Sequence, residues 1–188
     1  MTALRNRHQT TPAKLKFRRF AGAPRRLSRR RGFGIHSPFA FDFVKRVISQ
    51  PCSYYCYPVL SATARKNGIS SRYLKLLFRL ALFFRPASVA VYSDCDSAVT
   101  TALKAAVPEI SPAPEPEFMV VDRGGHEAEA LACLLRGGTV VIGPTAGNAA
   151  TIQHLWSGIS RGMLFRGSRT AIFVGRRHLP KQAFNIWL

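Results

Sequence analysis

Asp122 and His126 are the residues of this chain whose types and spacing suit proton transfer best. They flank the turn Gly124-Gly125 within the stretch Glu117–Gly143. A carboxylate or an imidazole acts as a general base when it lies within hydrogen-bonding reach of the proton that it removes. The alternative interpretation remains open, in which Asp122 caps a turn and His126 begins a helix.

The elements around these two residues are predicted to form a βαβ crossover. Phe118–Val121 is a short apolar run typical of a strand buried on both faces, and Thr139–Ile142 is a second one. Between them, His126–Arg136 has the spacing of an amphipathic helix, and Gly137 suits a left-handed cap at its end. The helix residues expected to face the sheet are Ala128, Leu131 and Leu135, with Ala132 and Leu134 beside them.

A βαβ crossover joins parallel strands, and open parallel sheets bind ligands beyond the carboxyl ends of their strands. Asp122 and His126 follow one such strand end, and Gly143-Pro144-Thr145 follows the next. We therefore expect these residues to border any small-molecule site.

The rest of the chain alternates predicted helices and strands. Ser37 and Pro38 are a good N-cap and first residue for a helix that Pro51 ends. Residues 52–69 are expected to be irregular. The further predicted elements are a helix at Ser70–Arg85, a strand at Ala87–Tyr92, a helix at Ser97–Val107 capped by Asp96 or Ser97, a linker at Pro108–Glu117, a helix at Ala149–Ser160, a hairpin of Met163–Phe165 with Thr170–Val174, and a closing strand with Phe184, Ile186 and Leu188 on one face.

Charge divides the chain into a near-neutral middle and two basic ends. The formal net charge is +19, and residues 1–41 and 130–188 contain no acidic residue. We interpret residues 1–31 as a basic, flexible arm ahead of one domain at 32–188. Nucleic acid or an anionic membrane surface is a natural partner for such ends, and a solubilising tail is the alternative.

The cysteines and the hydropathy pattern favour a cytoplasmic protein. Cys52, Cys56, Cys95 and Cys133 lack the paired spacing of a metal site, and we expect them to be reduced thiols. The basic N-terminus lacks the apolar region of a signal peptide. The longest apolar stretch, Tyr73–Phe84, is too short to cross a bilayer.

Four segments resemble one known family. They are GFGIHSPFAFDFVKRVI, YLKLLFRLALFFRPASVAVY, MVVDRGGHEAEAL and KQAFNIWL. They are similar to segments of small proteins related to class I S-adenosylmethionine-dependent methyltransferases, which share a basic arm and the GIHSPF motif. The resemblance implies a Rossmann-like, three-layer α/β sandwich with a contracted, mostly parallel sheet and a C-terminal antiparallel hairpin.

The resemblance also implies a cofactor, S-adenosylmethionine, and residues to hold it. Tyr92, Ser93, Asp94 and Gly143 would border the cofactor, and Asp122 or His126 would serve as the base toward an unidentified methyl acceptor. The loop at 91–97 contains no glycine, whereas this family uses a glycine-rich loop there so that the backbone can approach the cofactor. The second and third strands, with the acid that holds the ribose, are expected to be missing.

No metal is expected, because Gly143-Pro144 stands where metal-dependent relatives carry an acidic pair. Two functions therefore remain open. One is a divergent methyltransferase, and the other is a non-catalytic descendant of that fold, a pseudoenzyme whose basic ends bind nucleic acid or a partner protein.

Overall fold

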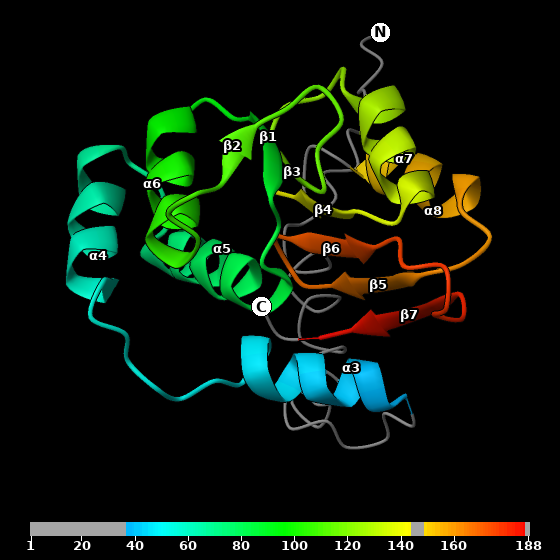
Figure 1. The fold of residues 1–188 in the computed structure, drawn as a ribbon, viewed down its shortest axis with the longest axis horizontal. Helices are drawn as coiled ribbons and strands as arrows, with labels where there is room; N and C mark the ends of the chain where they lie inside the picture. Colours follow the sequence, from blue (N-terminus) through cyan, green and yellow to red (C-terminus); the bar gives the residue numbers. More distant parts are fainter. Residues whose placement is uncertain (1–36, 144–148, 187–188) are drawn as a thin grey trace, which may run out of the picture.

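The computed structural model describes residues 37–143 and 149–186 (Figure 1). The predicted basic arm at 1–31 lies outside the described residues, as do Pro144, Thr145 and Leu188.

One sheet of seven strands forms the centre of the molecule, in the order β2-β1-β3-β4-β6-β5-β7. β6 runs antiparallel to its neighbours β4 and β5, and every other neighbouring pair is parallel. The expected α/β fold with a mostly parallel sheet is confirmed. The strands are β1 (Ser88–Tyr92), β2 (Ser111–Pro112), β3 (Phe118–Val121), β4 (Thr139–Ile142), β5 (Met163–Arg166), β6 (Ala171–Val174) and β7 (Gln182–Asn185).

Helices cover both faces of this sheet and make three layers. In β3, Phe118 and Val120 point into one apolar cluster and Met119 and Val121 into another, as a period of two dictates. The first cluster takes in the helices before β3, and the second takes in α7 and α8 (Figure 1). The helices are α3 (Pro38–Phe43), the π-helical turn η1 (Val44–Ile48), α4 (Tyr57–Lys66), α5 (Ser71–Phe84), α6 (Asp96–Ala106), α7 (Glu127–Arg136) and α8 (Ala149–Gly158).

The first described helix begins where the sequence predicts. The Ala40 N–H donates to Ser37 Oγ at 3.3 Å, and Pro38 occupies the first turn, where its missing N–H is not needed. Asp42 and Arg46 form an i,i+4 ion pair at 2.8 Å. None of the helices within 37–143 and 149–186 has both the length and the apolar run that a bilayer-spanning segment needs.

Two segments predicted to lack regular structure contain elements. α4 forms within the stretch expected to be irregular, with Pro58 in its first turn and Leu60 and Ala64 buried. β2 forms within the expected linker and pairs in parallel with β1 through Ser88↔Ser111 and Val89↔Pro112. A strand therefore lies beside β1, where the sequence led us to expect none.

The predicted inner face of α7 is wrong at Ala128, which is exposed, and at Leu135, which is 54% exposed. Leu131 packs against the core as predicted. The buried residues of α7 are Ala130, Cys133 and Leu134. The end of the helix matches the prediction, because Gly137 takes a left-handed φ of 103°.

The C-terminal part forms the predicted hairpin and closing strand. β5 and β6 pair antiparallel, and β7 then lies parallel to β5 at the sheet edge. The Phe184 ring stacks on Phe165 with centroids 5.3 Å apart, and Ile186 is fully buried.

Candidate functional site

The carboxyl ends of β1, β3 and β4 meet at one edge of the sheet. Tyr92 pairs with Val121, which pairs in turn with Ile142, so the residue after each strand lies at the same level. The Asp122 N–H donates to the Tyr92 carbonyl at 2.8 Å, and the Gly143 N–H donates to the Val121 carbonyl at 3.2 Å. The fold therefore places Ser93, Asp122 and Gly143 on neighbouring strand ends.

Tyr73 of α5 completes this edge. Its hydroxyl donates to Asp122 Oδ1 at 2.7 Å. A Cβ atom at Gly143 would lie 3.4 Å from that same carboxylate oxygen and 3.4 Å from the Tyr73 ring. Tyr73, Asp122 and Gly143 therefore fill the space between α5 and the strand ends.

Burial controls the protonation of both Tyr73 and Asp122. Removal from water raises the pKa of Asp122, Asp94 and Asp96 raise it further, and hydrogen bonds from Tyr73 and Ser93 oppose the rise. Burial and the neighbouring Asp122 charge raise the pKa of Tyr73 well above its ordinary value. Tyr73 thus keeps its proton and presents it to the carboxylate.

The turn between β1 and α6 satisfies its own backbone. The Ser93 N–H donates to Asp96 Oδ1 at 2.9 Å, and the Cys95 N–H donates to Ser93 Oγ at 3.2 Å. Asp96 is the first residue of α6 and Cys95 its N-cap, without a side-chain cap, so neither Asp96 nor Ser97 caps the helix as expected. These two amides face acceptors of the chain itself rather than solvent.

Asp94 lies at the exposed rim of this edge. Its carboxylate is 3.4 Å from Arg123 Nη1, and its side chain is 78% exposed. Asp94 therefore forms a surface ion pair, of the kind that contributes little to stability.

His126 packs face to face with Tyr92. The ring centroids are 3.7 Å apart, and the planes differ by 14°. His126 is the N-cap residue of α7, and its Nδ1 lies 3.9 Å from Glu129 Oε1, with no hydrogen-bond partner among the described residues. His126 thus both starts the helix and covers Tyr92.

The glycine turn before α7 is held by Glu127. The Gly125 N–H donates to one carboxylate oxygen at 3.1 Å, and the Thr151 hydroxyl donates to the other at 2.7 Å. The Thr151 hydrogen bond is the main cause that lowers the pKa of Glu127. This carboxylate joins the starts of α7 and α8 and is used structurally.

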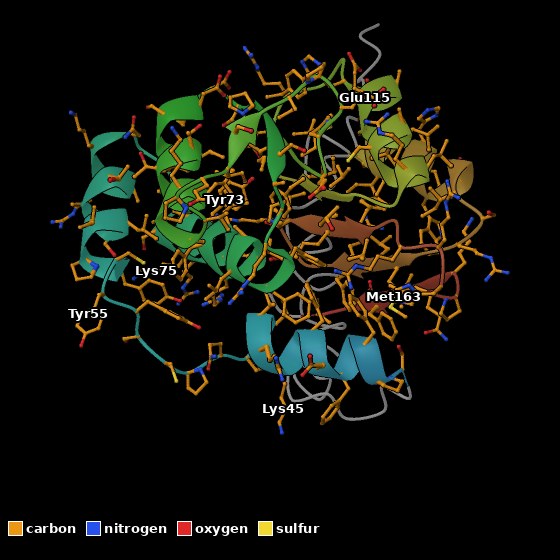
Figure 2. All side chains as sticks on the ribbon, in the orientation of Figure 1. Lys45, Tyr55, Tyr73, Lys75, Glu115 and Met163 are labelled. Carbon is orange, nitrogen blue, oxygen red and sulfur yellow. The ribbon has the colours of Figure 1, made fainter. Side chains whose placement is uncertain are left out.

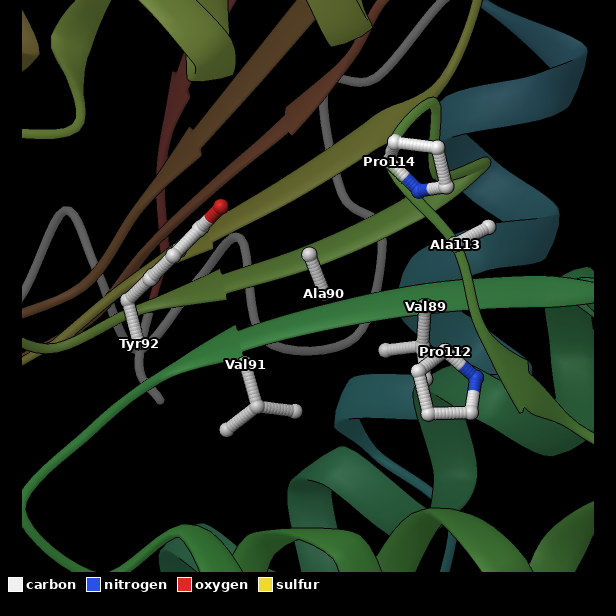
Figure 3. A pocket seen from close by; sticks show the side chains of 7 residues that line it. All are labelled: Val89, Ala90, Val91, Tyr92, Pro112, Ala113 and Pro114. Atoms are coloured by element: carbon white, nitrogen blue, oxygen red, sulfur yellow. The ribbon is translucent and has the colours of Figure 1, made fainter.

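An open cleft of about 440 Å³ runs along β1 beside this edge (Figure 3). Its lining is largely apolar and consists of Val89–Tyr92 and Pro112–Pro114. In Figure 3, Ala90 and Tyr92 point to one side of β1 and Val91 to the other. No acidic residue lines the cleft, although an acid near this position would be needed to hold ribose hydroxyls.

A second open cleft lies at the end of η1 and is lined by Asp42, Lys45, Arg46, Ser49, Gln50 and Pro51. Neither cleft is lined by Ser93, Asp122 or Gly143. Within 37–143 and 149–186, no group of three or more His, Cys, Asp or Glu side chains could hold a metal ion.

The structure thus brings together three of the six residues singled out from the sequence. Ser93, Asp122 and Gly143 meet at the strand ends, whereas Tyr92 and His126 pair with each other and Asp94 faces solvent. Tyr73 was missed. In the sequence, Tyr73 is a tyrosine next to the apolar stripe of α5, and nothing in that position indicates that it contacts Asp122, 49 residues further along the chain.

Comparison of the chain with protein-family models, with curated proteins and with solved structures gave no match.

Proposed function

We propose that this chain is related to class I S-adenosylmethionine-dependent methyltransferases, that its cofactor site is degraded, and that it works as a binding protein. The relationship is supported by the three layers, by the β6 strand inserted antiparallel between β4 and β5, and by the position of the quoted segments. MVVDRGGHEAEAL forms β3 and the start of α7, with Asp122 at the strand end.

The Tyr73–Asp122 hydrogen bond is the observation that carries the proposal of a degraded site. A cofactor bound across these strand ends needs free backbone amides and open space above them. Here the Tyr73 hydroxyl lies 2.7 Å from Asp122, and the ring lies 3.4 Å from the position of a Gly143 Cβ. The chain's own side chains fill the edge.

The four residues expected to hold S-adenosylmethionine do not fit that role. The Ser93 amide is bonded to Asp96, and Asp94 pairs with Arg123 at the surface. Gly143 is buried against Tyr73, and Tyr92 is stacked under His126. Of these four residues, only Tyr92 lines either of the two open clefts described above.

Calorimetric titration of the full chain with S-adenosylmethionine tests this proposal. We expect a dissociation constant above roughly 100 μM, equivalent to about −5.5 kcal/mol. A micromolar dissociation constant would contradict the proposal and restore Asp122, with its raised pKa, as a candidate base.

A further inference from the structure

Within the near-neutral middle of the chain, residues 42–129, basic and acidic residues are unevenly distributed. Between Asp42 and Asp94 the sequence contains no acidic residue. The basic residues of this interval are Lys45, Arg46, Arg65, Lys66, Arg72, Lys75, Arg79 and Arg85. All eight lie on or beside η1, α4 and α5, and only Arg46 forms an ion pair with another described residue.

Two of these cations are fixed on an aromatic ring. Lys75 Nζ lies 5.0 Å from the centroid of Tyr57, and Arg79 Nη1 donates to the Tyr57 hydroxyl at 3.4 Å. Arg79 Nε is buried and has no hydrogen-bond partner among the described residues. No described carboxylate forms an ion pair with Lys75 or Arg79, so the positive charge of the two side chains is not neutralised within the described residues.

The ring beneath them is anchored in the core. Tyr57 and Tyr54 both contact Phe78, with centroids 5.9 Å and 4.9 Å apart, and Phe78 is buried. The helical spacing of Arg72, Lys75 and Arg79 places them in one row along α5, about 10 Å long.

Tyr55 is fully exposed in the turn that precedes α4. Figure 2 shows it projecting outward on the same side of the molecule as Lys75. Burial of a large aromatic side chain against a ligand is favourable, because it removes apolar surface from water. Aromatic rings near cationic side chains are also characteristic of surfaces on which nucleic-acid bases stack.

We propose that Tyr55, Tyr57, Arg72, Lys75 and Arg79, which we call the α4–α5 surface, bind single-stranded nucleic acid. The cations contact phosphates, and the free face of Tyr55 stacks on a base. The bases of a duplex are already stacked on each other, so a single strand fits an exposed ring better. This inference specifies the partner of the proposed binding protein and rests on that proposal.

Fluorescence anisotropy with labelled oligothymidine and oligouridine of about twelve nucleotides, within the range that single-strand binders cover, tests the α4–α5 surface. Tyr55→Ala should raise the dissociation constant of the full chain about 5- to 100-fold for at least one of them. Tyr55→Phe keeps the ring and should change it less than about twofold. Neither variant alters the charge, so their difference reports stacking.

A second pair of variants tests the phosphate contacts. Lys75→Gln should make the slope of log affinity against log salt shallower by about 0.7, as expected for one phosphate contact on a single strand. Arg123→Gln makes the same charge change at the strand-end edge, outside the basic ends and the α4–α5 surface, and should leave the slope unchanged.

Three results would overturn the inference. They are an unchanged dissociation constant in Tyr55→Ala, equal binding of a duplex with the same dependence on Tyr55, and Tyr55-dependent binding to phosphatidylserine vesicles in place of the oligonucleotides. None of them bears on the S-adenosylmethionine titration, because the α4–α5 surface shares no residue with the Tyr73–Asp122–Gly143 edge. The two proposals can therefore fail separately.

Discussion

At the scale of residues, the hydrogen bond between Tyr73 and Asp122 joins two acids that both hold their protons more tightly than in water. Asp122 still accepts from the phenol at 2.7 Å, which offsets part of the cost of its burial. A carboxylate held in this way contributes specificity of packing and costs stability once it is charged.

The raised pKa of Asp122 determines how the difference in free energy of unfolding between wild type and Asp122→Asn depends on pH. Because the pKa of Asp122 in the folded protein lies above 3.8, the folded state binds more protons than the unfolded state just above that pH. Stability contributed by Asp122 is therefore present below pH 3.8 and is lost as the pH rises through the folded pKa.

Asp122→Asn removes this loss and keeps an acceptor for Tyr73. Urea denaturation from pH 3.5 to 7 should show wild type falling in free energy of unfolding relative to Asp122→Asn as the pH rises. A difference that is flat with pH, or that favours wild type at neutral pH, would mean that Asp122 is not desolvated as described.

The sequence predicted the strand-end residues of this site but not their partner. Asp122 and Gly143 follow apolar runs, so their place at the sheet edge follows from the βαβ pattern alone. Tyr73 reaches them only because α5 packs across that edge, which depends on tertiary contacts that no local pattern contains.

At the scale of elements, α7 shows where hydrophobic periodicity is insufficient. Its sequence, EAEALACLLR, is apolar around most of the helix, so several rotations bury a similar area. The observed rotation is set by close backbone contacts and by Cys133, whose Sγ donates to the Pro116 carbonyl at 3.2 Å. Burial raises the pKa of this thiol to about 11.

Gly175 tests this close packing of α7 on the sheet. A Cβ atom there would lie 2.1 Å from the Leu134 carbonyl oxygen, a backbone atom near the end of α7. Gly175→Ala should therefore lower the free energy of unfolding by at least about 1–3 kcal/mol, the usual cost of overpacking.

Gly124→Ala is the matched control, because the nearest atom to its added Cβ, Glu127 Oε1, is 3.9 Å away. It should change the free energy of unfolding by less than about 0.5 kcal/mol. Equal effects of the two substitutions on chemical denaturation would show that α7 does not approach Gly175 this closely.

At the scale of the whole molecule, charge is separated along the chain and in space. The stretch between Asp42 and Asp94, which has basic but no acidic residues, includes η1, α4 and α5. Asp94, Asp96 and Asp122 lie together at the strand ends. The net charge of residues 42–129 does not reveal this separation. The basic residues between Asp42 and Asp94 and the acidic residues from Asp94 onward cancel when their charges are added. A polyanion is attracted to the first region and repelled from the second.

Deletion of residues 1–31 separates the basic arm from the α4–α5 surface. The deletion removes eleven Lys and Arg residues, so oligonucleotide affinity should fall and depend less steeply on salt. The ratio of dissociation constants between Tyr55→Ala and Tyr55→Phe should remain the same, since stacking does not involve the arm. A ratio that collapses to unity in the shortened chain would assign binding to the arm alone.

Backbone amide NMR of the full chain tests the central claim most directly, because it reports on both regions in one sample. Oligothymidine should shift the amide signals of Tyr55 and Lys75, whereas any S-adenosylmethionine-dependent shifts of Ser93, Asp122 and Gly143 should not saturate below roughly 100 μM. Shifts of Ser93, Asp122 and Gly143 that saturate at micromolar S-adenosylmethionine, and none at Tyr55 and Lys75 with the oligonucleotide, would contradict the account and identify a working cofactor site.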